Sequence, residues 1–374
     1  MRHILIIASY GPSLINFRIS LIRDLLHRGY KVSVACPKKK FSIKLRKQLY
    51  DLGVKINFFS LENTGLNFFK DYKSILEIYK IIKSTKPNIV ISYTAKPVIY
   101  SGIVLKFFKK ISYFPLITGL GYTFVYKRSF KYKMLKYLMI KLYRKGLKNS
   151  KKVIFQNKDD QNLFLKLKII KKKKLSKVVN GSGVDLKKYP FSNLPSQPIF
   201  LMISRLLIDK GVREYVEAAK IVLSQFPKVK FQLAGYLDDN PSGISSKELK
   251  SWIKEGSIEY LGKVDFVQPI LQSCKYYVLP SYREGTPRST LEALSTGRPI
   301  ITTDTPGCRE TVIDKKNGLL VPIRDSIALA NAMMKLLRKK DKILEKMAYK
   351  SFLIAKNKFE VNKVNRSMLD IMSL

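Results

Sequence analysis

The stretch PIFLMISRLLIDKGVREYVEAAKIVL (198–223) contains the pattern on which the fold prediction rests. PIFLMISRL is a short apolar run typical of a strand, DKG is turn chemistry, and VREYVEAAKIVL has helical apolar spacing. Arg205 and Lys210 lie where this strand ends and this helix begins. In an open α/β sheet ligands bind at that edge, and a helix N-terminus there favours an anion. The two cations therefore predict an anion site between strand and helix.

The same alternation of strand-like and helical segments runs through the rest of the chain. Before residue 183 the strand-like runs are ILIIAS (4–9), KVSVACP (31–37), KINFFS (55–60), NIVISY (88–93), FPLITG (114–119), KKVIFQN (151–157) and KLSKVVN (174–180). After it they are IFLMIS (199–204), KFQLAG (230–235), IEYLG (258–262), YYVLPS (276–281), PIITTD (299–304) and GLLVP (318–322). This alternation predicts an α/β protein whose parallel sheets carry helices on both faces.

A segment without periodicity, VDLKKYPFSNLPSQP (184–198), separates the two sets of strands and contains three prolines. A chain of 374 residues is too long for one small core. We therefore predict two Rossmann-like domains, residues 1–190 and 191–374. Two such units that meet at a linker are expected to face each other across a cleft, a usual place for a ligand.

The composition narrows the classes of function. The net charge of +44 attracts polyanions, although lysines spread over a solvated surface would give the same number. No zinc-knuckle or aromatic RNA-binding signature accompanies it, so we expect no nucleic-acid partner. Cys36, Cys274 and Cys308 are isolated and odd in number, which suits a reducing compartment. The only histidines, His3 and His27, exclude a metal site built on imidazole.

The N-terminal stretch MRHILIIASYGP (1–12) predicts a first buried strand rather than a signal peptide, because it lacks a small-residue cleavage site and breaks at Gly11-Pro12. No segment approaches the ~20 apolar residues that a membrane-spanning helix needs. We therefore expect a cytoplasmic protein, or one that lies on the inner face of the cytoplasmic membrane.

Two basic stretches, KFFKKISYF (106–114) and FKYKMLKYLMIKLYRKGLKNSKK (130–152), favour contact with an anionic membrane surface. In the second stretch, apolar residues recur at helical spacing and basic residues surround them. Such a helix can lie in the headgroup plane with its lysines against anionic phosphates. The alternative is an amphipathic core helix with a solvated basic face.

The stretch SYREGTPRSTLEALSTGRPIITTD (281–304) carries the densest chemical signal. Thr286 followed by Pro287 predicts a helix N-cap with proline at the first helical position. Glu284 then lies in the loop before the helix, and Glu292 lies on its second turn. The free N–H groups between them suit a phosphate or a sugar hydroxyl. From spacing alone, an ordinary capping loop with one exposed glutamate explains the pattern equally well.

The motifs together resemble a known family. Arg205 and Lys210, Gly262, Glu284 to Pro287, Glu292, and Gly307 with Glu310 occur in the order found in family 4 of the retaining glycosyltransferases, which have the GT-B fold. The resemblance covers nearly the whole chain. NFRISLI (16–22), YTAKP (93–97) and GYLDDNPSGIS (235–245) are similar to the bacterial subgroup that extends undecaprenyl-diphosphate-linked saccharides or builds capsule, lipopolysaccharide and other surface polysaccharides.

The resemblance implies that this chain transfers a hexose, with N-acetylhexosamine as the expected sugar, from a UDP-sugar to a lipid-linked saccharide with retention. It also implies that the last helix packs back on the N-terminal domain. Arg205 and Lys210 would hold the donor diphosphate and stabilise the leaving UDP, and Glu284 would lie near the donor sugar. The remaining donor-binding residues it implies are Gly11, Gly262, Val264, Gly285, Thr286, Pro287 and Glu292, with Glu292 on the ribose hydroxyls and Gly262 and Val264 beside the base.

This chain departs from the family pattern in its N-terminal half, where only one glycine precedes the acceptor-side helix and no histidine is placed to contact the donor sugar. Lys96, Thr118 and Gly119, the last two in TGLGY (118–122), are the expected substitutes in the sugar or acceptor pocket. We expect no cofactor and no catalytic metal, because the basic pair and the helix end would hold the diphosphate. Asp238-Asp239 is interpreted as turn chemistry rather than a cation site.

Two other classes of function stay open from the residues alone. A UDP-sugar epimerase of similar build would need no acceptor. A polyanion-binding protein would need only the charge.

Overall fold

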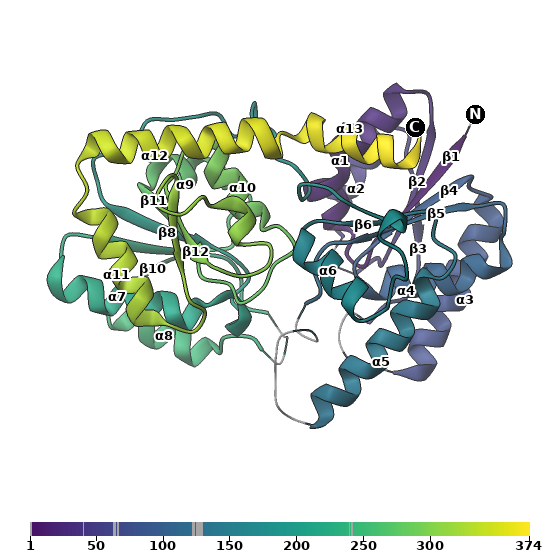
Figure 1. Ribbon diagram of the computed structural model, residues 1–374, viewed down its shortest axis with the longest axis horizontal. Coiled ribbons are helices and arrows are strands. Elements are labelled where there is room, and N and C mark those ends of the chain that lie inside the picture. Colours follow the sequence, from purple (N-terminus) through teal and green to yellow (C-terminus); the bar gives the residue numbers. More distant parts are fainter. Residues whose placement is uncertain are drawn as a thin grey trace. The chain divides into compact units, whose positions relative to one another are not determined.

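The computed structural model describes residues 2–374 except 40, 63, 64, 66, 122, 123, 125–129, 239 and 241, and gives no side-chain placement for residue 131. The chain forms two compact units (Figure 1). One contains the residues up to Ser182 together with Asn362–Leu374, and the other is Gly183–Val361. The predicted boundary at 190/191 therefore falls inside the second unit.

The segment predicted as a linker is packed onto the second unit. Arg298 is fully buried, and its guanidinium donates to the carbonyl oxygens of Ser192, Asn193 and Cys274. Val184 pairs with the chain before the last helix, since its N–H donates to the Phe359 carbonyl at 2.7 Å. A lack of periodicity marks irregular backbone, but does not show whether that backbone is held in place.

The first unit is a parallel sheet with strand order β3-β2-β1-β4-β5-β6-β7. The strands are β1 (His3–Ile7), β2 (Lys31–Cys36), β3 (Lys55–Phe58), β4 (Ile89–Tyr93), β5 (Ser112–Ile117), β6 (Val153–Phe155) and β7 (Ser176–Val178). One face packs on α1 (Pro12–His27), α2 (Ile43–Tyr50) and α13 (Val361–Met372). The other packs on α3 (Phe68–Thr85), α4 (Ala95–Val104), α5 (Phe130–Leu147) and α6 (Lys158–Lys166).

The last helix, α13, belongs to the first unit. Met368, Leu369 and Met372 are buried in the same core as α1. The Asn365 amide donates to Ser20 Oγ at 3.0 Å and to Asp24 Oδ2 at 2.6 Å. The end of the chain thus completes a helix layer whose other members come from the first 50 residues.

The second unit is a parallel sheet with strand order β10-β9-β8-β11-β12-β13. Its strands are β8 (Ile199–Ile203), β9 (Lys230–Ala234), β10 (Glu259–Gly262), β11 (Tyr276–Leu279), β12 (Ile300–Thr303) and β13 (Gly318–Val321). Its helices are α7 (Val212–Gln225), α8 (Ser246–Lys254), α9 (Gln268–Ser273), α10 (Arg288–Ser295), α11 (Ser326–Leu337) and α12 (Asp341–Ile354). The α/β prediction of two Rossmann-like parallel sheets is confirmed.

Each sheet has a point at which the strand order reverses. It lies between β1 and β4 in the first unit and between β8 and β11 in the second. Because all strands in a sheet are parallel, their carboxyl ends share one edge, and loops leaving neighbouring strands in opposite directions open a crevice there. Gly11 and Lys96 follow β1 and β4, and Arg205 and Glu284 follow β8 and β11. These four residues thus lie at the two reversal points.

Candidate active site

The loops after β8 and β11 are held together by backbone contacts. Gly211 has φ +74°, and a Cβ there would lie 2.2 Å from the Pro280 carbonyl oxygen, so only glycine fits. On the same side the Tyr282 N–H donates to the Asp209 carbonyl at 2.9 Å. This close approach brings the residue before Gly211, which is Lys210, to the loop that carries Glu284.

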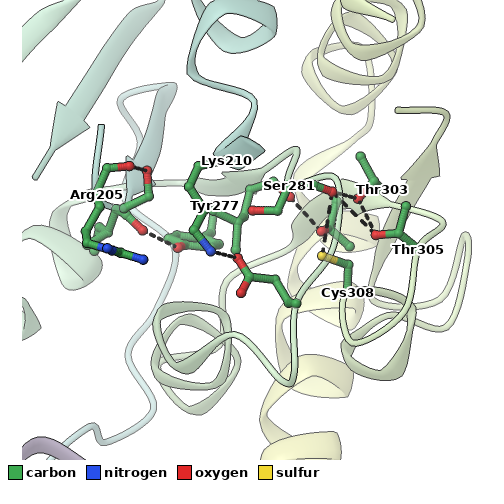
Figure 2. Close-up of polar contacts among 12 residues, drawn as sticks. Arg205, Lys210, Tyr277, Ser281, Thr303, Thr305 and Cys308 are labelled. Atoms are coloured by element: carbon green, nitrogen blue, oxygen red, sulfur yellow. Dashed lines mark hydrogen bonds and ion pairs between the residues drawn. The ribbon is translucent and has the colours of Figure 1, made fainter. Parts of the chain in front are cut away.

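Lys210 and Glu284 form an ion pair, with 2.5 Å between Nζ and Oε1 (Figure 2). Both side chains are mostly buried, at 16 % and 15 % exposure, so solvent screens this pair less than a surface pair. An ammonium has three donors, so Lys210 can keep Glu284 and still donate to a phosphate. The sequence placed these residues at one edge, and the structure brings them into direct contact.

The Glu284 backbone is fixed by the loop that follows β12. Its N–H donates to the Pro306 carbonyl at 3.0 Å. Gly307 has φ +81°, and a Cβ there would lie 2.4 Å from the Glu284 carbonyl oxygen. Any other residue at position 307 would therefore displace Glu284. Glu310, from the same motif, pairs through Oε2 with Lys358 Nζ at 3.0 Å, a partner that the sequence did not suggest.

Arg205 is the more open of the two cations, with 48 % of its side chain exposed. Its Nη1 lies 3.1 Å from Oδ2 of Asp238 in the loop after β9. Oδ1 of Asp238 accepts the Asn240 N–H at 3.1 Å, which is the turn chemistry that the sequence predicted. Asp239 lies outside the described residues. Across the described ranges, no group of three or more His, Cys, Asp or Glu side chains could hold a metal ion.

The start of α10 differs from the prediction. The helix begins at Arg288, and Pro287 is the N-cap residue in an extended conformation. The Thr286 hydroxyl donates to the Gly285 carbonyl at 2.9 Å, so Thr286 does not cap the helix. The predicted N-cap was wrong by one residue, because Pro287 occupies the last extended position before the helix rather than the first helical one.

Glu292 lies on the second turn of α10 and is 8 % exposed. Its Oε1 lies 2.9 Å from Nε of Arg288, and the same guanidinium donates to the Gly183 carbonyl. Arg288 was missed in the sequence, although its i, i+4 spacing to a glutamate is a known helix pairing signal. Burial, and next the Glu292 charge, raise the pKa of the Tyr189 hydroxyl well above its usual range. The carboxylate is therefore mostly buried, with Arg288 and Tyr189 beside it.

A buried hydroxyl network joins the loops after β11 and β12 (Figure 2). The Thr303 hydroxyl donates to the Ser281 carbonyl and lies 3.0 Å from Thr305 Oγ1. Cys308 Sγ lies 3.9 Å from the same carbonyl, and burial raises the pKa of this thiol to about 11. The thiol is thus neutral near pH 7. The network anchors the chain just before Glu284.

Gly262 is the last residue of β10, and Val264 lies in the loop after it. The Gly262 carbonyl accepts the Gly235 N–H at 2.8 Å, and no atom lies within 4 Å of its Cβ direction. Val264 is half-buried. Both are at the carboxyl edge, as Arg205 and Glu284 are, but on the outer strand of the sheet.

The candidates of the first unit lie at the carboxyl edge of its sheet, at the reversal point or one strand beyond it. Lys96 Nζ pairs with Asp71 Oδ1 at 2.8 Å, and both side chains are about one-seventh exposed. Thr118 and Gly119 follow β5, while Tyr122 of the same loop lies outside the described residues. Asp71 is a further polar residue at this edge that the sequence did not suggest, because it comes from the first turn of α3.

Three features of this edge hold its backbone in place. Thr94 has φ +69°, a conformation that costs a non-glycine residue on the order of 1 kcal/mol or more and that concentrates at functional sites. A Cβ at Gly11 would lie 2.4 Å from the Phe41 ring, which gives this glycine a packing role. Ser13 Oγ lies 2.8 Å from the Tyr93 hydroxyl and ties the start of α1 to the end of β4.

A hollow of about 430 Å³ in the second unit lies away from these residues. Pro198, Val229 and Lys275 line it and precede β8, β9 and β11. It therefore lies at the amino ends of the strands, opposite the candidate site.

The comparisons with known proteins agree with this geometry. Residues 197–339 match the model of glycosyl transferases group 1, and residues 3–157 match that of glycosyl transferase 4-like proteins. N,N'-diacetylbacillosaminyl-diphospho-undecaprenol alpha-1,3-N-acetylgalactosaminyltransferase of Campylobacter jejuni is 32% identical over 87% of this chain and 87% of its own length. UDP-Gal:alpha-D-GlcNAc-diphosphoundecaprenol alpha-1,3-galactosyltransferase of Escherichia coli is 26% identical over 76% of this chain and 74% of its own length.

Solved structures show the same architecture. Sucrose-phosphate synthase from Thermosynechococcus elongatus superposes with a TM-score of 0.80 at 18% identity, covering 100% of this chain and 98% of that one. HepE from Anabaena in complex with UDP superposes with a TM-score of 0.77 at 19% identity, covering 100% of both chains. The fold and these matches define a GT-B glycosyltransferase. The chain belongs to the group 1, family 4-like glycosyltransferases.

Proposed function

We propose that this glycosyltransferase moves an N-acetylhexosamine, with retention, from a UDP-sugar to an undecaprenyl-diphosphate-linked saccharide in bacterial glycan or surface polysaccharide synthesis. The observation that carries the proposal is the Lys210–Glu284 pair at the strand-order reversal, with Arg205 beside it. The names of the two relatives support the acceptor class, since both act on saccharides carried on a diphosphate-linked undecaprenol.

Arg205 and Lys210 supply the electrostatic part of the mechanism. Charge builds up on the diphosphate as the glycosidic bond breaks, so cations fixed at that edge stabilise the transition state more than the bound donor. Glu284 orients Lys210 and accepts a hydrogen bond from a donor-sugar hydroxyl. Glu292, on the second turn of α10, accepts hydrogen bonds from the ribose hydroxyls.

Retention follows from attack by the acceptor hydroxyl on the face that the diphosphate leaves. The hydroxyl oxygen bonds to the anomeric carbon, the bond to the β-phosphate oxygen breaks, and that phosphate takes the hydroxyl proton. The Escherichia coli relative supports this outcome, since its name pairs a UDP-galactose donor with an alpha product. No metal ion takes part in the proposed step.

The test incubates the purified chain with UDP-N-acetylgalactosamine and an undecaprenyl-diphosphate-linked monosaccharide. We expect product heavier by one N-acetylhexosamine with an alpha anomeric proton coupling, formed about 10²–10³-fold more slowly by Lys210→Ala. A beta product would contradict retention. Conversion of the UDP-sugar without acceptor would favour an epimerase instead.

The second part of the proposal is a peripheral membrane contact through residues 106–114 and 130–152, on the cytoplasmic side. None of the helices in the described ranges is long and apolar enough to cross a bilayer. In α5, Tyr143 and Leu147 are buried, but Met134 and Tyr137 near its start are exposed. The first half of α5 therefore does not behave as a core helix.

Charge reversal tests this contact. Lys133, Lys141 and Lys145 are exposed, whereas the Arg144 guanidinium donates to the Leu167 carbonyl at 2.7 Å and is left intact. We expect sedimentation with anionic vesicles to fall at least about tenfold when the three lysines become Glu, because each basic residue adds about 1 kcal/mol near such a surface. Equal binding to duplex DNA and vesicles would favour a general polyanion binder.

A further inference from the structure

The first turn of α3 exposes large aromatic side chains. Phe68 is 83% exposed and Phe69 is 90% exposed, and Tyr72 and Leu76 are also exposed. Further along the helix, Ile78, Ile81 and Ile82 are buried in the core. The helix thus packs on the sheet by its later turns and holds its first turn, capped by the Asn67 side chain, in the solvent.

This first turn lies next to the candidate residues of the first unit. Asp71, on the same turn, pairs with Lys96 at 2.8 Å. Because α3 follows β3, its start lies at the carboxyl edge of the sheet, where Lys96, Thr118 and Gly119 also lie. The exposed aromatics are therefore within one helical turn of Asp71, the ion-pair partner of Lys96, which is predicted to lie in the sugar or acceptor pocket.

The same helix layer carries an unusual charge. No acidic residue occurs between Glu77 and Asp159, a segment that contains α4 and α5 and many lysines. α4 packs against both α3 and α5 in one layer. Near the aromatic turn, Lys70 and Lys73 of α3 are paired with Glu62 and Glu77, and Lys96, the single lysine of α4, is paired with Asp71. The positive charge of this layer therefore comes mainly from α5, whose Lys133, Lys141 and Lys145 are exposed.

We infer that the first turn of α3 inserts Phe68, Phe69 and Tyr72 into the boundary between headgroups and acyl chains of an anionic bilayer. This rests on the proposed membrane contact. Exposed aromatic side chains in the same helix layer as the basic α5 have the chemistry of an interfacial anchor. Insertion there orients the Lys96 edge towards the depth at which a lipid-linked diphosphate emerges from the membrane. The lysines of α5 supply the electrostatic attraction, and the aromatic side chains supply the part of the binding that salt does not weaken.

The test compares Phe68→Ser/Phe69→Ser with Phe266→Ser, which removes a 75% exposed phenylalanine from the second unit. Both are measured by sedimentation with phosphatidylglycerol–phosphatidylcholine vesicles that contain no polyprenyl lipid, at low and high salt. At high salt, we expect the double variant to bind at least about tenfold more weakly than the wild type. Phe266→Ser should bind as the wild type does. Unchanged thermal unfolding of both variants shows that the fold is retained.

A second measurement does not depend on losing binding. Phe69→Trp keeps an aromatic at the most exposed position, and Trp252, the single native tryptophan, is buried in the second unit. We expect vesicles to shift the emission of the new tryptophan to the blue and brominated lipids to quench it. An emission that vesicles leave unchanged would overturn the insertion.

The outcomes separate this inference from the proposed function. If the α5 charge reversal abolishes binding and the double variant binds as the wild type does, the aromatic turn is not the anchor and the proposed contact stands. If the wild type fails to bind anionic vesicles, both are wrong, while transfer to a water-soluble acceptor still tests the enzyme itself. If the double variant loses transfer to that water-soluble acceptor, the turn serves the acceptor and not the bilayer.

Discussion

The carboxyl edges of the two sheets are built differently. In the second unit Lys210, Glu284 and Glu292 are each paired and mostly buried, and Gly211 and Gly307 fix the loops that carry them. In the first unit the edge has one mostly buried ion pair, a strained Thr94 and an exposed aromatic turn. A leaving diphosphate has the same charge and shape in every turnover, so a preorganised site suits it. A lipid-linked acceptor needs an edge open to a membrane.

The largest expected effect is at Lys210. Lys210→Ala should lower kcat by about 10²–10³-fold, the scale of losing one preorganised donor aimed at developing charge. It also leaves Glu284 without its cation. Steady-state kinetics measure kcat. Lys96→Ala is the matched control, because it removes a paired lysine from the edge of the other sheet. An equal fall in kcat for Lys96→Ala would break the comparison between the edges.

Gly307→Ala should come next. The added Cβ meets the Glu284 carbonyl, and φ +81° strains any L side chain, so Glu284 must shift and turnover should fall at least about tenfold. Gly256→Ala is the control, because Gly256 has φ +70° but nothing within 4 Å of its Cβ direction. Gly256→Ala should lose on the order of 1 kcal/mol of unfolding free energy, and Gly307→Ala should lose more, because its Cβ also meets backbone atoms. Only Gly307→Ala should lose activity, as thermal unfolding and kinetics together can show.

Glu292→Gln should weaken UDP binding about tenfold and change kcat less, because ribose contacts are similar in the ground and transition states. It also removes the carboxylate that compensates Arg288. Titration calorimetry with UDP gives the affinity. A normal UDP affinity in a folded variant would remove Glu292 from the donor site.

Lys96→Ala should raise KM for the acceptor severalfold and leave UDP affinity unchanged, because Lys96 belongs to the other unit's edge. Asp71→Asn, which keeps the shape of the partner, should have the smaller effect of the two. Acceptor titrations at saturating donor measure both. A change in UDP affinity alone would instead make this edge part of the donor site.

The smallest expected effect is that of chelation. Excess EDTA should leave the rate within about twofold of its value without chelator, because the cations at the second edge carry the charge stabilisation that a divalent ion would otherwise supply. Loss of activity that Mg²⁺ or Mn²⁺ restores would contradict this.

The sequence by itself determined the features that depend on neighbours along the chain. The period of apolar residues and the turn chemistry at 208–211 predicted strand, turn and helix, and the structure has β8, a short 3₁₀ turn and α7 there. The same signals placed Arg205, Lys210 and Glu284 at strand ends. Local rules were weakest at boundaries, as the start of α10 and the end of the first unit show.

Only the tertiary structure decided which of these residues meet. Lys210 and Glu284 are 74 positions apart and touch because β8 and β11 are neighbours, and strand order is not written in any local pattern. Lys96 finds Asp71, and Arg298 binds the segment predicted as a linker, for the same reason. Apolar periodicity predicts which face of a helix or strand is buried. The ion-pair partner of a charged side chain, in contrast, depends on which loops the strand order brings together.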